Sequence, residues 1–310
     1  MSFDAPDPEI LSRPPGTAAR ERIYRYVLFL CASLSIFVTL AIVTLLAVEA
    51  VDFFTLVDPV AFFTGTEFLL SRNQFGVLPL LSGTILVTVI AGLIALPTGV
   101  AAAVYLSEYA SERARSVLKP ALEVLAGIPT VVYGIFALVY VTPFLQNLGL
   151  PLNTFNVLSA SIMVGIMIIP MVSSLSEDAM SAVPDSLRRA AYGIGATKYE
   201  VSTGVVIPAA ISGIFSSFIL ALSRAIGETM IVVVAMGSRS RLIDYANPLQ
   251  NLFEGNQPMT AAMVQINGAD NVSGPGFKSM FAIGLTLFVI TFLMNLASNR
   301  IAARYREEYE

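Results

Sequence analysis

The chain has 310 residues, of which 55% are apolar and only 13% are charged, and its longest apolar runs exceed the length of about 18 residues that indicates a bilayer span. A net charge of -4 without any basic tract argues against nucleic acid as a partner. A single cysteine, Cys31, and the absence of histidine exclude a disulfide framework and a thiolate or imidazole metal site. We expect an all-α, multi-pass membrane protein without a cofactor.

The first apolar run extends from Tyr26 to Val48 and follows a polar N-terminal tail, residues 1–25. A cleavable signal peptide has an apolar core of only about 7 to 15 residues. This run is longer, so the sequence predicts a retained membrane-spanning helix.

Three more spans are predicted from charge-free stretches. Residues 73–107 carry no charge, and the helix is expected near 78–102. Residues 124–176 are also free of charge and are long enough for two helices of about 20 residues each. We expect these two helices to be separated by a turn around 148–153.

The segment of about 177–204 then returns to polar composition. Pro184 followed by Asp185 is a helix-start signal, and a short helix, a glycine turn and a second short helix are predicted after it. One face of the first helix is small and apolar, with two arginines beside it, which suits docking into a groove on another protein. A position on the lipid surface is the alternative. The face consists of Leu187, Ala190, Ala191 and Ile194, and the arginines are Arg188 and Arg189.

A fifth span is predicted over 205–236 and a sixth over 280–297. The fifth contains two charged residues, Arg224 and Glu228. Each costs about 2.5 to 3.5 kcal/mol near the bilayer centre, so such residues normally face a bundle interior or a wet cavity. Their spacing of four places both on one face of a continuous helix.

The loop between these two spans, about 237–278, is long enough to be functional. Within it, residues 258–266 predict a short helix at the outer membrane surface, where we expect an extracytoplasmic protein to dock. A solvated loop without structure is the alternative. Residues 26–298 thus form the membrane domain, and residues 299–310 form a C-terminal tail.

Several predicted spans contain prolines and glycines. One interpretation is that these residues only let helices approach closely, and the other is that broken helices line a hydrated pathway. The sequence leaves both open. The residues concerned are Pro97, Pro129, Pro143 and Pro170, with Gly83, Gly92 and Gly99 in the second span.

The distribution of basic residues predicts the orientation. Thirteen of the 18 Lys and Arg residues fall in segments on the same side as the N-terminus if six spans are counted. The positive-inside rule makes that side cytoplasmic. Both termini are therefore expected in the cytoplasm, since an odd number of spans would place Arg300, Arg304 and Arg306 outside.

The segment 177–204 resembles the coupling loop of ABC-importer permeases, whose pattern is Glu-Ala-Ala, three residues, Gly, nine residues and Ile-x-Leu-Pro. At the family spacing, Arg189 replaces the glutamate, while the alanines, glycine and ending match at Ala190, Ala191, Gly195, Val205, Ile207 and Pro208. The substitution puts in doubt any polar contact of that glutamate with an ATPase. We expect Gly195 to reverse the chain at a positive φ angle.

Other stretches resemble the permease of phosphate ABC importers, C-type (PstC-type) rather than A-type. They are Phe62–Phe68, Gln74–Pro79, Tyr105–Tyr109, Leu125–Gly134 and Arg224–Met230. The resemblance implies the type I ABC importer permease fold, a plasma-membrane location and a role in moving inorganic phosphate into the cell. It also implies three protein partners besides the lipid bilayer: a PstA-type second permease, a dimeric ABC ATPase and an extracytoplasmic phosphate-binding protein.

The chain has no phosphate-cradling Gly-x-x-x-x-Gly-Lys-Ser/Thr loop, so it is expected to be non-catalytic, with ATP hydrolysed by a partner. Arg224 offers a planar fork that fits phosphate, and we expect it to pair with Glu228 until phosphate competes for it. A purely structural ion pair is the alternative. For the whole chain the alternatives are the A-type subunit, a permease for another oxyanion, a channel or secondary transporter, and a signalling protein that senses the importer.

Overall fold

The computed structural model describes residues 17–269 and 274–304. Most of the expected N-terminal tail (1–16), part of the outer loop (270–273) and the end of the C-terminal tail (305–310) lie outside the described residues.

The described chain is almost entirely helical, and five helical segments are long and apolar enough to cross a membrane, or six if one bent pair counts as one span. This confirms the predicted fold class. The first span is longer than predicted and begins before Tyr26. The straightforward spans are α1 (Thr17–Leu56), α3 (Leu78–Val104), α7 (Val157–Ser181) and α15 (Pro275–Arg304).

The third span is built from three pieces that run on from one another. They are α5 (Thr130–Phe136), a π-helical segment η3 (Ala137–Val141) and α6 (Thr142–Asn147). It follows α4 (Glu112–Gly127), which begins after η2 (Tyr105–Tyr109), the π-helical continuation of α3.

The fifth span differs most from its prediction. A bend of 69° separates the segment Lys198–Ala209 from α11 (Ile211–Ile226), and α11 then stops in the middle of the predicted span. A separate short helix, α12 (Met230–Ala235), follows. The expectation of one continuous helix over 205–236 is wrong. Before the bend lie α9 (Lys198–Val201), η4 (Ser202–Val206) and α10 (Ile207–Ala209).

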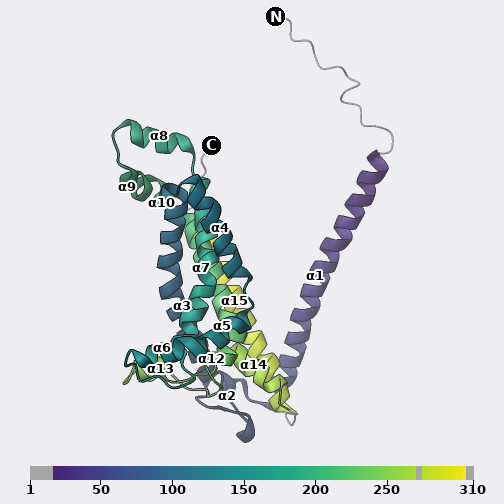
Figure 1. Cartoon of the computed structure of the whole chain (residues 1–310). Coiled ribbons are helices and arrows are strands. Elements are labelled where there is room, and N and C mark those ends of the chain that lie inside the picture. The colour runs from purple at the N-terminus through teal and green to yellow at the C-terminus, as the bar shows by residue number, and fades with distance from the viewer. Residues whose placement is uncertain (1–16, 270–273, 305–310) are drawn as a thin grey trace, which may run out of the picture.

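Short elements lie at the two ends of the bundle (Figure 1). At one end is α8 (Asp185–Gly193), beside α9. At the other end are α2 (Pro59–Thr64), β1 (Phe68–Leu69) paired antiparallel with β2 (Gln74–Phe75), the turn η1 (Leu70–Arg72), α13 (Gln250–Phe253) and α14 (Met259–Asn267). The start of α1 and the end of α15 lie at the same end as α8, as an even number of spans requires.

The core is built around α3 and α7, which pack closely along their length. Small residues allow this approach. A Cβ atom on Gly99 would lie 2.7 Å from Cβ of Val172, and one on Gly165 would lie 3.2 Å from the carbonyl oxygen of Ala91. The close-approach interpretation is therefore correct for these glycines, in agreement with helix packing in membranes generally.

Phenylalanines from several elements form a second cluster where α1 meets the bundle. Phe53 of α1 stacks edge-to-face with Phe62 and Phe75, at centroid distances of 5.5 and 5.6 Å. Lys278 of α15 also forms an ion pair with Asp52 of α1 at 3.0 Å. Beyond this cluster α1 leans away from the other helices, and its apolar side chains there are exposed (Figure 1).

Candidate functional site

The break between α11 and α12 lies inside the predicted fifth span. Between α11 and α12, residues Gly227, Glu228 and Thr229 leave the helix. The side chain of Thr260, from α14, donates a buried hydrogen bond of 2.7 Å to the carbonyl oxygen of Glu228. Irregular backbone at this depth is tolerated where it is buried in protein or lines an aqueous cavity. The hydrogen bond from α14 satisfies one of the backbone groups that the break releases.

Arg224 and Glu228 flank the break but do not face each other. Glu228 is buried, and its Oε1 accepts a hydrogen bond of 3.2 Å from the N–H of Ile231, at the start of α12. Arg224, in the last turn of α11, is exposed. Among the described residues no hydrogen bond or ion pair engages the Arg224 guanidinium. The expected Arg224–Glu228 pair on one helical face is therefore not seen, because the helix ends between the two residues.

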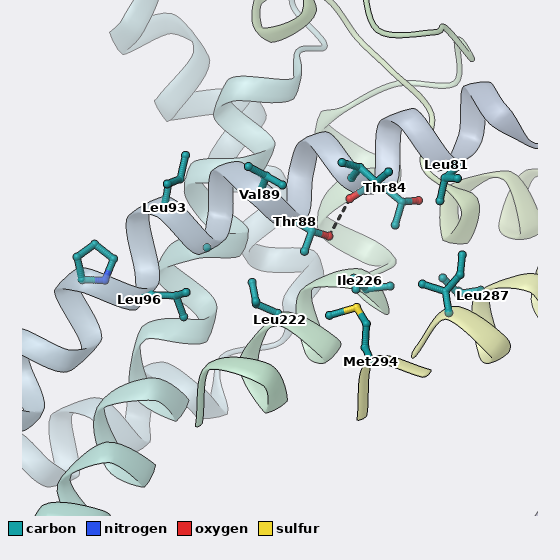
Figure 2. A pocket seen from close by; sticks show the side chains of 14 residues that line it. Leu81, Thr84, Thr88, Val89, Leu93, Leu96, Leu222, Ile226, Leu287 and Met294 are labelled. Atoms are coloured by element: carbon teal, nitrogen blue, oxygen red, sulfur yellow. Dashed lines mark hydrogen bonds between the residues drawn. The ribbon is translucent and has the colours of Figure 1, made fainter. Parts of the chain in front are cut away.

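A cleft with a volume of about 640 Å³ lies between α3, α11 and α15 (Figure 2). Leu222 and Ile226 of α11 line it, and its walls are apolar except for Thr84 and Thr88, whose hydroxyls donate to carbonyl oxygens of α3 itself. An apolar cleft does not suit a dianion, since burying unpaired charge is costly. Arg224 lies two residues from Leu222 and two from Ile226 along α11. Since each residue turns the helix by about 100°, Arg224 lies on roughly the opposite side of α11 from the cleft.

The predicted coupling loop forms two short helices, α8 and α9, joined by a turn at Gly195. Gly195 has a φ angle of +91°. Its N–H donates to the carbonyl of Tyr192, and the N–H of Ala196 donates to that of Ala191, which together make a Schellman motif at the end of α8. The expected positive φ at Gly195 is confirmed.

The residues of α8 that are buried and exposed differ from the prediction. Leu187 and Ala191 pack inward against an apolar cluster that includes Met180 and Val201. Ile194, expected on the same face, is 88% exposed. Three further residues of the resemblance are exposed: Arg189 and Ala190 in α8, and Pro208 in α10 close to the 69° bend.

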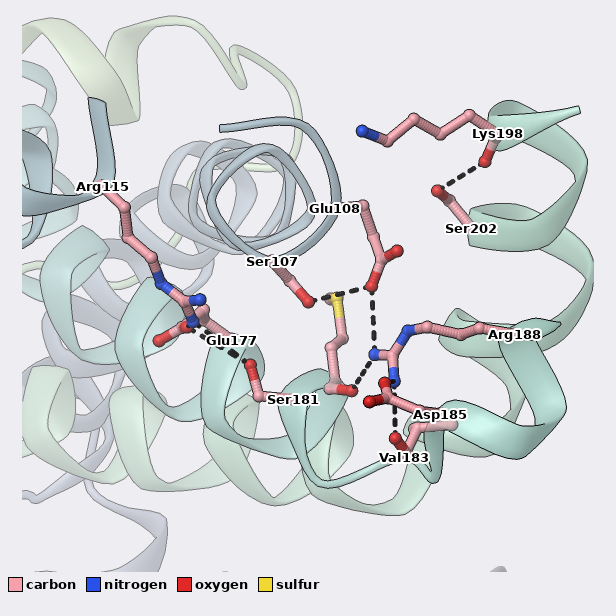
Figure 3. A network of polar contacts seen from close by, with 11 residues as sticks. Ser107, Glu108, Arg115, Glu177, Ser181, Val183, Asp185, Arg188, Lys198 and Ser202 are labelled. Carbon is pink, nitrogen blue, oxygen red and sulfur yellow. Dashed lines mark hydrogen bonds and ion pairs between the residues drawn. The ribbon is translucent and has the colours of Figure 1, made fainter. Parts of the chain in front are cut away.

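Arg188 is the polar attachment of α8 to the membrane domain (Figure 3). Its guanidinium donates to the carbonyl oxygens of Val183 and Met180 at 2.5 and 2.7 Å, and it forms an ion pair of 3.1 Å with Glu108 of η2. The side chains of Arg188 and Glu108 are only 16% and 6% exposed. Arg188 was expected beside the docking face and Glu108 had no expected role, because nothing in the sequence shows that two residues 80 positions apart meet.

A second ion cluster lies at the same end of the molecule. Glu177 of α7 is fully buried and pairs with Arg115 and, at 2.6 Å, with Lys119, both from α4. These pairs attach α4 to α7. From the sequence, Arg115 and Lys119 indicated only the orientation of the chain in the membrane.

The outer loop is also ordered differently from its prediction. The short helix exists as α14, but Met259, Thr260, Ala261, Ala262 and Ile266 are buried within the bundle. The expected helix therefore exists with one face buried, while Val264 and Gln265 on its other side are exposed, and docking of an extracytoplasmic protein on it stays a prediction. Another exposed part of the loop lies before α14.

That exposed part is held by Asp244. Its carboxylate accepts hydrogen bonds from the side-chain amide of Asn247 and from the backbone N–H groups of Ala246 and Asn247, which hold the pKa of the carboxyl below its usual value. Tyr245 and Leu249 next to it are 87% and 63% exposed. The turn thus exposes apolar side chains at this end of the molecule.

Comparison with known proteins gives one family and a consistent set of relatives. The model of the family described as "Binding-protein-dependent transport system inner membrane component" matches residues 95–307. A phosphate transport system permease protein PstC from Mesorhizobium japonicum is 35% identical over 255 residues, covering 74% of this chain and 76% of the relative. A probable ABC transporter permease protein, YqgH, from Bacillus subtilis is 30% identical over 284 residues, covering 90% of both chains.

Solved structures with the same fold are much less similar in sequence. A chain of a bacterial alginate ABC transporter, in complex with an alginate-bound periplasmic protein, aligns with a TM-score of 0.64 at 15% identity, covering 92% of this chain and 96% of that one. A chain of the MetNI methionine ABC transporter in an inward-facing conformation aligns with a TM-score of 0.55 at 17% identity, covering 81% of this chain and 100% of that one. These likenesses show the ABC-importer permease fold.

Proposed function

Because the chain belongs to the family of binding-protein-dependent transport system inner membrane components, we propose that it is the C-type membrane subunit of an ATP-driven importer of inorganic phosphate. It forms the pathway with a PstA-type second permease. A dimeric ATPase binds the side that carries α8, which is cytoplasmic together with both termini. A phosphate-binding protein delivers substrate to the opposite side.

The observation that carries the proposal is the exposed, unengaged guanidinium of Arg224 at the break of a membrane-spanning helix. A permanent charge is too costly to leave facing lipid, so it faces the pathway or the partner subunit. Guanidinium binds phosphate oxygens bidentately. Arg224 therefore serves as the phosphate ligand in the membrane.

Glu228 acts as the discriminating group in this proposal. Among the described residues its Oε2 carries no hydrogen bond, while Oε1 is held by the N–H of Ile231. A carboxylate accepts a hydrogen bond from protonated phosphate but repels sulfate, which has no proton to donate at neutral pH. Phosphate is therefore selected at the break by the combination of one guanidinium and one carboxylate.

The chain hydrolyses no ATP itself in this account, and the loop α8–α9 transmits the work of the partner ATPase. The exposed Arg189, Ala190, Tyr192 and Ile194 form the contact surface. Arg189 replaces the acidic residue of the family pattern, so its partner on the ATPase is an acceptor rather than a donor.

Reconstitution tests the function. The two permeases and the ATPase are placed in vesicles with ATP on the α8 side and loaded binding protein on the other, and labelled phosphate uptake is measured. We expect uptake that requires ATP and the binding protein and that excess sulfate does not compete away. Phosphate movement without ATP would identify a channel or secondary transporter, and ATP-dependent movement of sulfate alone would identify another oxyanion as substrate.

A further inference from the structure

Among the described residues, no backbone hydrogen bond joins the coupling loop to the second span or its continuation, so the contacts between them are made by side chains. Along the chain, α8 and α9 are connected to α7 on one side and, through η4 and α10, to α11 on the other. The backbone therefore carries any displacement of α8 to α7 and α11. Helix α3 has no such connection, yet it is the main packing partner of α7.

Two polar contacts join the loop to the end of α3. Arg188 of α8 pairs with Glu108 at 3.1 Å, and Lys198 of α9 lies 5.1 Å above the ring of Tyr109. Both acceptors belong to η2, the π-helical segment that continues α3 (Figure 3). Ser107 of the same segment donates a hydrogen bond of 3.0 Å to Glu108, which fixes the position of the carboxylate.

The Arg188 side chain holds three elements at once. Its two carbonyl acceptors, on Met180 and Val183, belong to the end of α7 and the residues after it, while Glu108 belongs to η2. Apolar contacts between α8 and α3 also exist, but they are non-directional and allow sliding. The ion pair is directional and nearly excluded from water, so it fixes the register between the two elements.

We propose that Arg188 and Glu108 are positioning residues for transport: their ion pair makes the end of α3 move as one body with the coupling loop. This rests on the proposed function, in which the ATPase displaces α8. Without the pair, α8 still binds the ATPase through its exposed face and ATP is still hydrolysed. The displacement then reaches α7 and α11, but the end of α3 at η2 no longer follows the loop in a fixed register, and hydrolysis no longer opens the pathway.

A distance measurement tests the proposal directly. In a Cys31→Ser background with cysteine-free partners, spin labels are placed at Ala101→Cys on α3 and Ser186→Cys on α8, both at exposed positions. Pulsed electron spin resonance then gives the label separation in the assembled importer, without ATP and with ATP trapped. We expect one unchanged separation for the otherwise native importer and an ATP-dependent separation for Glu108→Gln.

Two controls separate this role from a general loss of stability. Glu177→Gln disrupts the other buried ion cluster at the same end, which attaches α4 and not the loop, and should leave the separation independent of ATP. Glu108→Asp keeps the charge and shortens the side chain by one carbon, so it should fold if Glu108→Gln does not. We expect it to give a smaller ATP-dependent change.

Transport supplies the second readout. Glu108→Gln and Arg188→Gln should lower phosphate moved per ATP hydrolysed at least tenfold, while the ATPase remains bound and active. A native separation that changes with ATP, or a variant separation that stays constant, would overturn the proposal. The distance depends on ATP and not on the solute, so an importer that moves no phosphate would refute the proposed function and leave this inference testable.

Discussion

Two arginines of this chain occupy opposite situations. Arg188 is nearly excluded from solvent and has its donors engaged by two carbonyl oxygens and two carboxylates. Arg224 is exposed and, among the described residues, unengaged. A guanidinium whose donors are engaged by protein groups, as in Arg188, contributes to stability, because removing a partner leaves a buried charge uncompensated. An unengaged one at membrane depth is free to bind a ligand, which is why the two are given different roles.

The backbone conformation of Gly195 restricts substitution. With φ at +91° and no atom within 4 Å of an added Cβ, a side chain there is strained by conformation and not by lack of space. We expect Gly195→Val to destabilise the turn by about 1–2 kcal/mol, and to leave the protein inserted but with impaired coupling. The measurement is phosphate uptake together with ATPase co-purification.

Gly193 provides the matched control for this substitution. It also has no atom within 4 Å of an added Cβ, but it is the last residue of α8. Gly193→Ala should therefore be neutral or slightly stabilising. Native uptake and ATPase association in Gly195→Val would show that the turn is not needed for coupling.

At the scale of elements, π-helical segments and helix ends lie beside the residues to which roles are given. Segment η2 carries Glu108 and Tyr109, η4 leads into the 69° bend, and the end of α11 exposes Arg224. Such single-turn irregularities are frequently found at functional sites. Two contacts of these elements can be tested separately.

The first contact that can be tested is the hydrogen bond from Thr260 of α14 to the carbonyl oxygen of Glu228 in the break. We expect Thr260→Val, which keeps the side-chain shape but leaves the carbonyl of Glu228 without this donor, to cost about 1–3 kcal/mol of stability, and to lower uptake while the ATPase stays bound. Thr286→Val in α15 is the control, because the carbonyl that Thr286 bonds, that of Ala282, lies one turn earlier in the same helix. Thermal unfolding in detergent and uptake are measured, and equal behaviour of the two variants would argue against the contact.

The second contact that can be tested is the close packing of α3 on α7. Gly99→Val would place Cβ within 2.7 Å of Val172, so we expect a loss of about 1–3 kcal/mol from overpacking. Gly127→Ala, where an added Cβ meets nothing within 4 Å, is the control and should be tolerated. The melting temperatures of the purified variants test this prediction. A native melting temperature for Gly99→Val would mean that the two helices are not in contact at this position.

The helical class, the loop α8–α9 and the turn at Gly195 could be predicted because each has a local signal: apolar length, a helix-start pair and a fixed glycine. The break after Ile226 could not, since a glycine inside a membrane helix is usually tolerated and no local rule separates the two outcomes. The burial of α14 and the Arg188–Glu108 pair depend on long-range packing. The prediction that Arg224 and Glu228 share one helical face came from their spacing alone. It was wrong because the helix is not continuous between them.

At the scale of the whole molecule, the described start of α1 and end of α15 lie at the same end as α8, and the exposed outer-loop turn lies at the opposite end (Figure 1). This arrangement and the charge bias predict the orientation in the membrane. In a Cys31→Ser background, Tyr245→Cys should react with an impermeant thiol reagent on intact cells, whereas Ser186→Cys should react only after the membrane is opened. The reverse pattern would invert the topology.

The account depends most on Arg224 as the phosphate ligand of the pathway. Since the structure shows no ion pair between Arg224 and Glu228, removing the guanidinium leaves no carboxylate that has lost its partner. Both Arg224→Gln and the double variant with Glu228→Gln should therefore assemble with the ATPase. Arg113→Gln, which removes an exposed arginine of α4, is the control for charge removal.

The decisive measurement is ATP-dependent phosphate uptake by vesicles that contain the assembled double variant. We predict that uptake is reduced at least a hundredfold, about 2.7 kcal/mol of lost interaction with the anion, while Arg113→Gln transports at the native rate. Uptake by the double variant near the native rate would contradict the role given to Arg224.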